Sequence, residues 1–235
     1  MQIDFLNADK DYQEIMLAKD IDSFLKRLSN YDCKRCSLSE HKDNQIVIYR
    51  GNPNAEIVLV GEAPGMVEAK LGEAFVGPAG VLADKIFASV NIDTNKDMFL
   101  GNICLHRPVA EKGSGKQNYT PYAEQTKLCK PYILKMIELI NPKIVIAFGR
   151  VAAINLFKLG TKTRMKHIVG KFFQDDSEPV MKDRWLYTMY HSSYLLRVQY
   201  HKDAQILKQE VWNHVKLLRS KAEELNINFK ETYIA

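Results

Sequence analysis

The sequence lacks any apolar stretch of the roughly 18 residues that a membrane-spanning helix needs, so it predicts no membrane protein. Residues 1–10 contain Asp4 and Asp9 and no long apolar segment, which does not fit a secretory signal. Internal repeats and low-complexity tracts are also lacking. We therefore expect a soluble protein of the cytoplasm, held in a reducing compartment.

A strong charge imbalance is lacking as well. The chain has 33 Lys and Arg against 28 Asp and Glu, a net charge of +5. This mild excess permits nucleic-acid binding without demonstrating it, and it is too small for a histone-like protein. With 235 residues, 46% of them hydrophobic, we expect one domain over residues 1–235. Its core would span about 31–219, with an N-terminal helix at 11–29 and a tail at about 221–235.

Cysteine is scarce, with four residues in the chain. Cys33 and Cys36 form a Cys-x-x-Cys pair, and Cys104 and Cys129 stand alone. In an intracellular chain such a pair binds metal or acts in redox chemistry more often than it forms a disulfide. The spacing alone leaves metal or iron–sulfur ligation and two unligated thiols equally open.

Apolar runs alternate with amphipathic segments along the chain. The runs predict a short outer strand at 46–49 and core strands at 56–60, 98–102, 143–148 and 185–190. The amphipathic segments predict helices at 11–29, 80–90, 121–140 and 150–159, and a long last helix around 207–218. This alternation predicts an α/β fold, a three-layer α/β/α sandwich around a mostly parallel four-stranded sheet.

Residues with chemical functions follow the expected strands. Gly61-Glu62-Ala63-Pro64-Gly65 comes directly after the strand at 56–60, and Phe75 lies in the glycine-rich segment beyond it. Asn102 and His191 end or follow two other strands. Each residue alone has an ordinary structural explanation. Because ligand clefts of open α/β sheets lie at the carboxyl ends of the strands, their joint placement indicates a pocket.

Four motifs in order over about residues 31–219 resemble the family-four uracil-DNA glycosylases. The motifs are Gly61–Gly65 with Phe75-Val76-Gly77, Gly101-Asn102-Ile103 with Arg107-Pro108, Asn141–Val145 with Gly149, and His191-Ser192-Ser193-Tyr194-Leu195-Leu196-Arg197. The resemblance implies hydrolysis of the N-glycosidic bond of deoxyuridine, flipped out of single- or double-stranded DNA, in base excision repair. The product would be an abasic site, and we expect a monomeric enzyme. Two alternatives stay open: a catalytically weak or inactive DNA-binding module, and a glycosylase for another deaminated base.

The same resemblance implies a role for each site residue. Glu62 would activate the water, Phe75 would stack on uracil, Asn102 would read its edge, and His191 would donate to a uracil oxygen. Backbone amides around Gly61 would line the pocket, and Glu68 would exclude the methyl group of thymine. At the DNA, Ser193 would contact the substrate, while Tyr194, Leu195 and Leu196 would fill the gap left by the base. Arg197, Lys202, Lys112 and Lys116 would meet phosphates.

The resemblance also implies a structural 4Fe-4S cluster. Where the family has its third cysteine, directly before Arg-Pro, this chain has His106, and Cys104 lies two residues earlier. Residues two apart on a strand share a face, so either side chain reaches the cluster, and histidine ligation is known in Rieske centres. We expect Cys33, Cys36, His106 and Cys129 as ligands, with Cys104 as the alternative to His106. Zinc also fits this spacing.

Two departures from the family pattern concern the mechanism and the last motif. An X-type branch of the superfamily traps the abasic sugar covalently through a loop histidine. The corresponding segment here, Lys116-Gln117-Asn118-Tyr119, has no histidine, so we expect ordinary turnover without a stable adduct. Ser192 replaces the proline that usually follows the histidine, which we expect to loosen the wedge.

Overall fold

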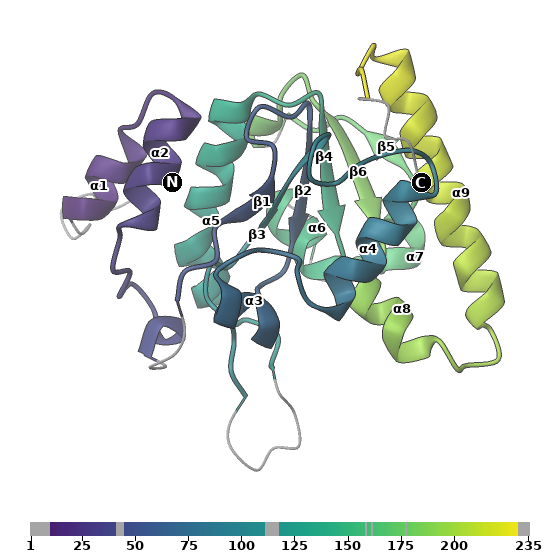
Figure 1. Cartoon of the computed structure of the whole chain (residues 1–235), viewed down its shortest axis with the longest axis horizontal. Coiled ribbons are helices and arrows are strands. Elements are labelled where there is room, and N and C mark those ends of the chain that lie inside the picture. Colours follow the sequence, from purple (N-terminus) through teal and green to yellow (C-terminus); the bar gives the residue numbers. More distant parts are fainter. Residues whose placement is uncertain are drawn as a thin grey trace.

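A six-stranded sheet forms the centre of the molecule in the computed structural model (Figure 1). The structure describes residues 10–40, 45–110, 118–157, 159–160, 162–176 and 178–229. The strand order is β1-β3-β2-β4-β6-β5. The strands are β1 (Tyr49–Gly51), β2 (Ile57–Gly61), β3 (Met98–Asn102), β4 (Ile144–Phe148), β5 (Phe172–Phe173) and β6 (Trp185–Met189).

The expected mostly parallel α/β sheet is confirmed. The strands β3, β2, β4 and β6 are parallel, and their residues are almost all buried. The sheet has six strands rather than four because β1 and β5 add antiparallel edges. The strand β5 has only two residues, both half-buried, which is too short for an alternating pattern to be recognised.

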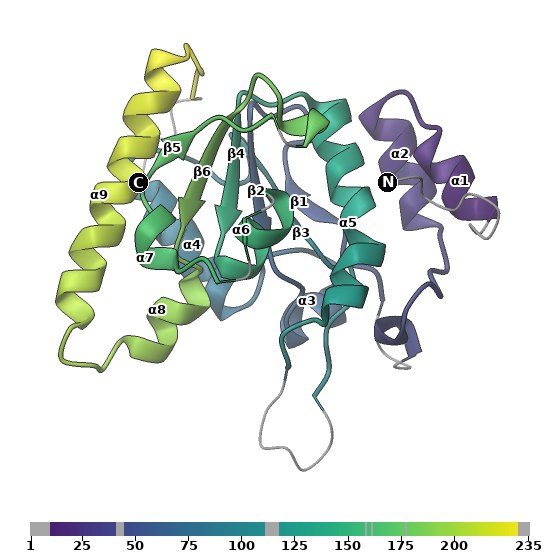
Figure 2. The same cartoon turned by 180° about the vertical axis from the view of Figure 1, so that it is seen from behind.

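Helices cover both faces of this sheet (Figures 1 and 2). On β2, Ile57 and Leu59 belong to the core beneath one helical layer, whereas Val58 and Val60 belong to the opposite core. This follows from the two-residue period of a strand. The first layer contains α4 (Pro78–Ala88) and α9 (Ala204–Glu224), and the second contains α2 (Ile21–Ser29), α5 (Ala123–Ile140) and α6 (Arg150–Leu156). The remaining helices are α1 (Lys10–Met16), α3 (Met66–Leu71), α7 (Met165–Ile168), α8 (Ser192–Val198), and the 3₁₀ turns η2 (Ser37–Glu40) and η3 (Pro179–Met181).

The single N-terminal helix expected at 11–29 is wrong, because two helices, α1 and α2, cover this region. The side chain of Asp20 accepts a hydrogen bond from the backbone N–H of Ser23 at 2.8 Å and so caps a new helix. Leu17 lies in the break between the two helices and is 73% exposed. Among the described residues, no helix has both the length and the apolar character needed to cross a bilayer.

Candidate functional site

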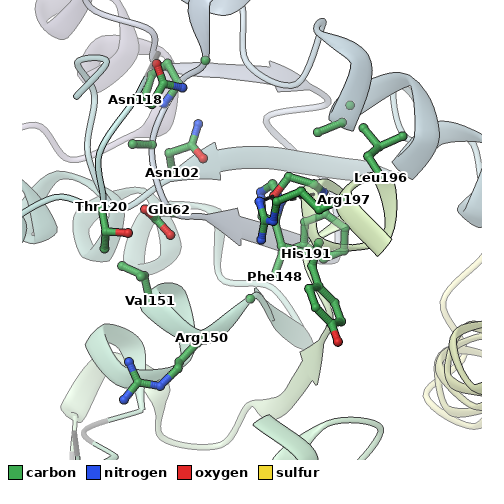
Figure 3. A pocket seen from close by; sticks show the side chains of 18 of the residues that line it. Glu62, Asn102, Asn118, Thr120, Phe148, Arg150, Val151, His191, Leu196 and Arg197 are labelled. Carbon is green, nitrogen blue, oxygen red and sulfur yellow. Dashed lines mark hydrogen bonds between the residues drawn. The ribbon is translucent and has the colours of Figure 1, made fainter. Parts of the chain in front are cut away.

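The carboxyl edge of the parallel strands carries the main cavity. Glu62 follows β2, Asn102 ends β3, Phe148 ends β4, and His191 comes two residues after β6. The register pairs Gly61 with Asn102, so the ends of β2 and β3 are level. All four side chains line one cavity of about 1210 Å³. Figure 3 shows Glu62 and Asn102 in its middle, with Thr120 on one side and His191 on the other.

The glycine-rich loop between β2 and α4 is held by one buried carboxylate, that of Glu68. Its two oxygens accept the backbone N–H groups of Gly65 at 3.1 Å and Gly77 at 2.8 Å. A Cβ on Gly65 or Gly77 would lie within 3 Å of these oxygens. Glu68 also lines the cavity, but its carboxylate is already committed to the loop backbone. Exclusion of the thymine methyl group by this side chain stays a prediction.

The backbone of Phe75 is strained, and close packing against two glycines fixes the position of its ring. Its backbone has φ +56°, a region that a bulky residue rarely adopts and that costs on the order of 1–2 kcal/mol. A Cβ at Gly80 would stand 1.7 Å from the Phe75 carbonyl oxygen, so only glycine fits there. Gly61 lies behind the cavity wall, where a Cβ would meet both Asn102 Oδ1 at 2.5 Å and Phe75 Cζ at 2.7 Å. Gly61 therefore allows the amide and the ring to come together.

The carboxylate of Glu62 is half-buried beside two groups that favour its charged form. Burial raises its pKa above the ordinary value, while the nearby Arg197 charge and a hydrogen bond from the Thr120 hydroxyl oppose that increase. Thr120 was not among the residues expected at the site, because the helix expected at 121–140 places it directly before a helix start. The helix α5 in fact begins at Ala123 with Tyr122 as its N-cap, so Thr120 is free to face the cavity.

The imidazole of His191 is half-buried beside Phe148, with a ring-centroid distance of 4.9 Å. Burial, together with the charge of Arg197, lowers the pKa of His191 to about 4. Its Nδ1 accepts the backbone N–H of Ser193 at 3.1 Å and lies 2.8 Å from Ser193 Oγ. The side chain is therefore neutral at physiological pH.

The start of α8 forms one wall of the cavity, but not with all of the residues expected there. Tyr194, Leu196 and Arg197 line it, and the Tyr194 side chain is 39% exposed. Leu195 is only 9% exposed and does not line the cavity, because its position on α8 faces the protein interior. Its expected part in the wedge is therefore not supported by the structure. Ser192 is fully buried and donates to the carbonyl oxygen of Ala79 in α4 at 2.6 Å, so this end of α8 is fixed although proline is lacking.

The segment after β3 contributes a further wall. Asn118 lines the cavity, and its Oδ1 accepts a hydrogen bond from Arg107 Nε at 2.6 Å. Lys112 and Lys116, expected at phosphates, lie outside the described residues. Lys202 is exposed but does not line the cavity.

The four cysteines are free thiols that face one region beside α5. Cys129 interacts electrostatically with Cys33, Cys36 and Cys104, and its thiol is hydrogen-bonded to that of Cys104. The backbone N–H of Leu105 also points at Cys129 Sγ, 3.3 Å away. The hydrogen bond to Cys129, together with burial, raises the pKa of Cys104, whereas the hydrogen bonds from Cys104 and from the Leu105 N–H lower that of Cys129. Thiols of this kind are the soft donors that iron–sulfur clusters and zinc use.

The guanidinium of Arg35 places a positive charge near these thiols. The Arg35 guanidinium packs 3.7 Å from the Tyr12 ring centroid and donates to the carbonyl oxygen of Leu128 at 3.2 Å. Burial raises the pKa of Cys33 and Cys36, and the Arg35 charge offsets only part of that increase; the same charge adds to the lowering of the Cys129 pKa. In the described part of the chain, no three His, Cys, Asp or Glu side chains stand close enough together to hold a metal ion without adjustment. His106 is buried and shares a second cavity with Cys33.

Comparison with known proteins identifies the family of this chain. The family model for the uracil DNA glycosylase superfamily matches residues 48–216. The chain belongs to the uracil-DNA glycosylase superfamily. The resemblance found in the sequence is thereby confirmed, and the matched residues include every strand of the sheet and all four cavity residues first expected.

Individual relatives agree with this family. The chain is 35% identical to a type-4 uracil-DNA glycosylase of Archaeoglobus fulgidus over 145 residues, 60% of this chain and 68% of the relative. It is 30% identical to a type-4 uracil-DNA glycosylase of Thermotoga maritima over 181 residues, 76% of this chain and 85% of the relative. It is also 26% identical to part of a DNA polymerase of Bacillus phage SP01, over 69% of this chain and 16% of that protein.

Proposed function

We propose that this protein is a uracil-DNA glycosylase that hydrolyses the N-glycosidic bond of a flipped-out deoxyuridine in DNA and leaves an abasic site. The observation that carries the proposal is the convergence of Glu62, Phe75, Asn102 and His191 on one cavity. Its volume of about 1210 Å³ exceeds the need of a single base and leaves room for the sugar and adjoining phosphates. Base excision repair is the process that this reaction serves.

Recognition of uracil uses the back of this cavity. The Asn102 amide carries N–H donors and a carbonyl acceptor, which complement the carbonyl oxygen and the N3–H donor on the edge of uracil, and it is only 3% exposed. The ring of Phe75 offers a stacking surface whose position is fixed by Gly80 and by the loop that Glu68 holds. A buried amide left unpaired by the wrong base costs more than the matched pair gains, which favours uracil over bases with the opposite edge pattern.

Hydrolysis uses Glu62 and His191, which line the same cavity. The bond between C1′ of the sugar and N1 of uracil breaks, and its electron pair leaves with the base. His191 donates a hydrogen bond to the uracil oxygen on which this negative charge develops, which typically stabilises the transition state by about 3 kcal/mol. The ionised Glu62 orients the water that attacks C1′ and accepts its proton.

A 4Fe-4S cluster held by the cysteines is the cofactor that this site best fits. Cys33, Cys36 and Cys129 are common to both ligand sets, and Cys104 or His106 supplies the fourth position. When bound, the cluster ties the segment around η2, the end of β3 and α5 together, and no step of the reaction passes through it. The direct thiol contact between Cys104 and Cys129 supports Cys104, and the place of His106 in the family motif supports His106.

Release of free uracil from a labelled oligonucleotide tests the activity directly. We expect Asn102→Ala and His191→Ala to lose roughly 100- to 1,000-fold in rate, because each removes a group that acts on the base. The matched controls Asn213→Ala and His201→Ala change exposed residues away from the cavity and should keep full activity. Binding of uracil-containing DNA without uracil release by the unmodified protein would instead establish a DNA-binding module.

A further inference from the structure

The side chains of Ser193 and Arg197 form a series of hydrogen-bond contacts that ends at Nδ1 of His191, and both residues also line the cavity. We propose that the Ser193 hydroxyl and the Arg197 guanidinium are positioning groups that hold His191 in the tautomer with its proton on Nε2. The inference deepens the proposed function and rests on it, because the tautomer matters to the reaction only if His191 donates to the departing base. The sequence had suggested DNA contacts for both residues.

The hydrogen bonds around Nδ1 determine where the imidazole proton lies. A backbone N–H only donates, so Nδ1, 3.1 Å from the Ser193 nitrogen, must accept. A ring nitrogen that accepts a hydrogen bond carries no proton, and the proton of a neutral imidazole is then on Nε2.

The Ser193 hydroxyl is oriented by Arg197. Arg197 Nη1 lies 3.3 Å from Ser193 Oγ, and a guanidinium has no acceptor, so Oγ accepts from it. The hydroxyl hydrogen is then free to donate to Nδ1 across the shorter distance of 2.8 Å. Two donors of Ser193 therefore meet the Nδ1 edge of the imidazole, and the positive charge of Arg197 lies near the same ring; Figure 3 shows Arg197 beside His191.

The other two protonation states of His191, the Nδ1–H tautomer and the imidazolium, are disfavoured by Ser193 and Arg197. A proton on Nδ1 would oppose the Ser193 N–H directly, and an imidazolium would add a second positive charge beside Arg197. With Nδ1 facing Ser193, Nε2 on the other side of the ring is the nitrogen left for a ligand in the cavity. The opposite tautomer would present a lone pair to the developing negative charge of the base and would hinder its departure.

The hydroxyl adds to what the backbone provides. Without it, the backbone N–H of Ser193 would still donate to Nδ1 at 3.1 Å. The hydroxyl adds a second and shorter hydrogen bond to the same nitrogen, and it connects that nitrogen to Arg197.

Nitrogen-15 NMR of histidine-labelled protein tests the proposal without relying on activity. In the unmodified protein we expect Nδ1 of His191 to show the shift of an unprotonated, hydrogen-bonded nitrogen and Nε2 that of a protonated one. Ser193→Ala should raise the pKa of His191 by about one unit, the equivalent of one lost hydrogen bond, and lower kcat about tenfold with KM nearly unchanged. Ser193→Thr, which restores a hydroxyl, should recover both values, and Ser220→Ala on the exposed side of α9 should change neither.

Three results would overturn the proposal. A protonated Nδ1 in the unmodified protein would refute the tautomer, and an unchanged His191 pKa in Ser193→Ala would refute the part of the hydroxyl. If Arg197→Met raises KM but leaves the His191 pKa unchanged, Arg197 contacts only phosphate. Failure of the proposed function looks different, since the protein would then release no uracil while the NMR spectra still reported the tautomer.

Discussion

Replacement of Thr120 by valine isolates a single hydrogen bond to the group that activates water. The substitution keeps the shape of the side chain and removes the hydroxyl that donates to Glu62. Because that hydrogen bond stabilises the ionised carboxylate, its loss must raise the pKa of Glu62. Hydrolysis needs the ionised form, so the acid limb of the pH–rate profile must move to higher pH.

The size of the movement follows from the strength of such a bond. A hydrogen bond to a charged group contributes about 1.5–3 kcal/mol, and 1.36 kcal/mol corresponds to one pKa unit. Glu62 is only half-buried, so the lower end of the range applies. We expect the limb to move by about one unit. The variant should then be about tenfold slower at pH values below the limb and nearly as fast as the unmodified protein well above it.

The assay is single-turnover release of uracil over a range of pH. Thr120→Ser keeps the hydroxyl and should keep the original profile. Thr188→Val makes the same chemical change outside the cavity and should leave the limb in place. An equal loss of rate at every pH would show that Thr120 acts on something other than the ionisation of Glu62, and an unmoved limb would refute the reasoning altogether.

The remaining predictions concern the cysteines, the core, the reaction product and acid stability. The sequence favoured His106 as the fourth ligand, but the Cys104 thiol already contacts that of Cys129. Of the variants Cys104→Ala and His106→Ala, we therefore expect Cys104→Ala to lose the larger share of bound iron by elemental analysis, and the reverse result assigns the fourth position to His106. The buried hydroxyl of Thr188 has no hydrogen-bond partner among the residues that the structure describes. Thr188→Val should therefore stabilise the protein by about 1 kcal/mol and raise its Tm by roughly 2–4 °C in calorimetry; a lower Tm would contradict this. After incubation with uracil-containing DNA, a denaturing gel should show no heat-stable shifted band, because Asn118 is a poor nucleophile. The pKa of His191 is about 4 in the folded state and about 6.5 in the unfolded state, so the unfolded state binds more protons between these two pH values. The free energy of unfolding, measured with urea, should therefore fall by up to about 3 kcal/mol as the pH decreases from 6.5 to 4. His191→Gln should reduce this loss.

The strands that are buried on both faces of the sheet were predictable from the sequence. The continuous apolar runs of β3 and β4 indicated Met98–Asn102 and Ile144–Phe148 to within one residue. The prediction of one helix at 11–29 was wrong because hydrophobic periodicity does not reveal a break between two helices that a single N-cap residue creates. Asp20 ends the regular pattern by binding the Ser23 N–H, while the apolar spacing continues on both sides of it.

The site was predictable where strand ends determine it and was missed where loops meet. Glu62 and Asn102 follow directly from the rule that pockets lie at carboxyl ends of parallel strands. Thr120 reaches Glu62 only because the segment between β3 and α5 returns across the cavity, a contact that no local pattern encodes. Leu195 was misplaced for a related reason, because the buried face of α8 is set by its packing on α4 and α9.

The replacement of proline by Ser192 changes how His191 is held, not whether it is held. A proline would restrict the backbone next to the histidine and stabilise chiefly by limiting the unfolded chain, by about 0.4–1 kcal/mol. The Ser192 hydroxyl instead donates to the Ala79 carbonyl at 2.6 Å, a buried bond of about 1 kcal/mol. The two effects are similar in size, but the hydrogen bond joins α8 to α4, and α4 also contains the glycine that supports Phe75. The positions of the imidazole and of the stacking ring are therefore coupled through α4 in this chain, which a proline acting only on its own backbone would not achieve.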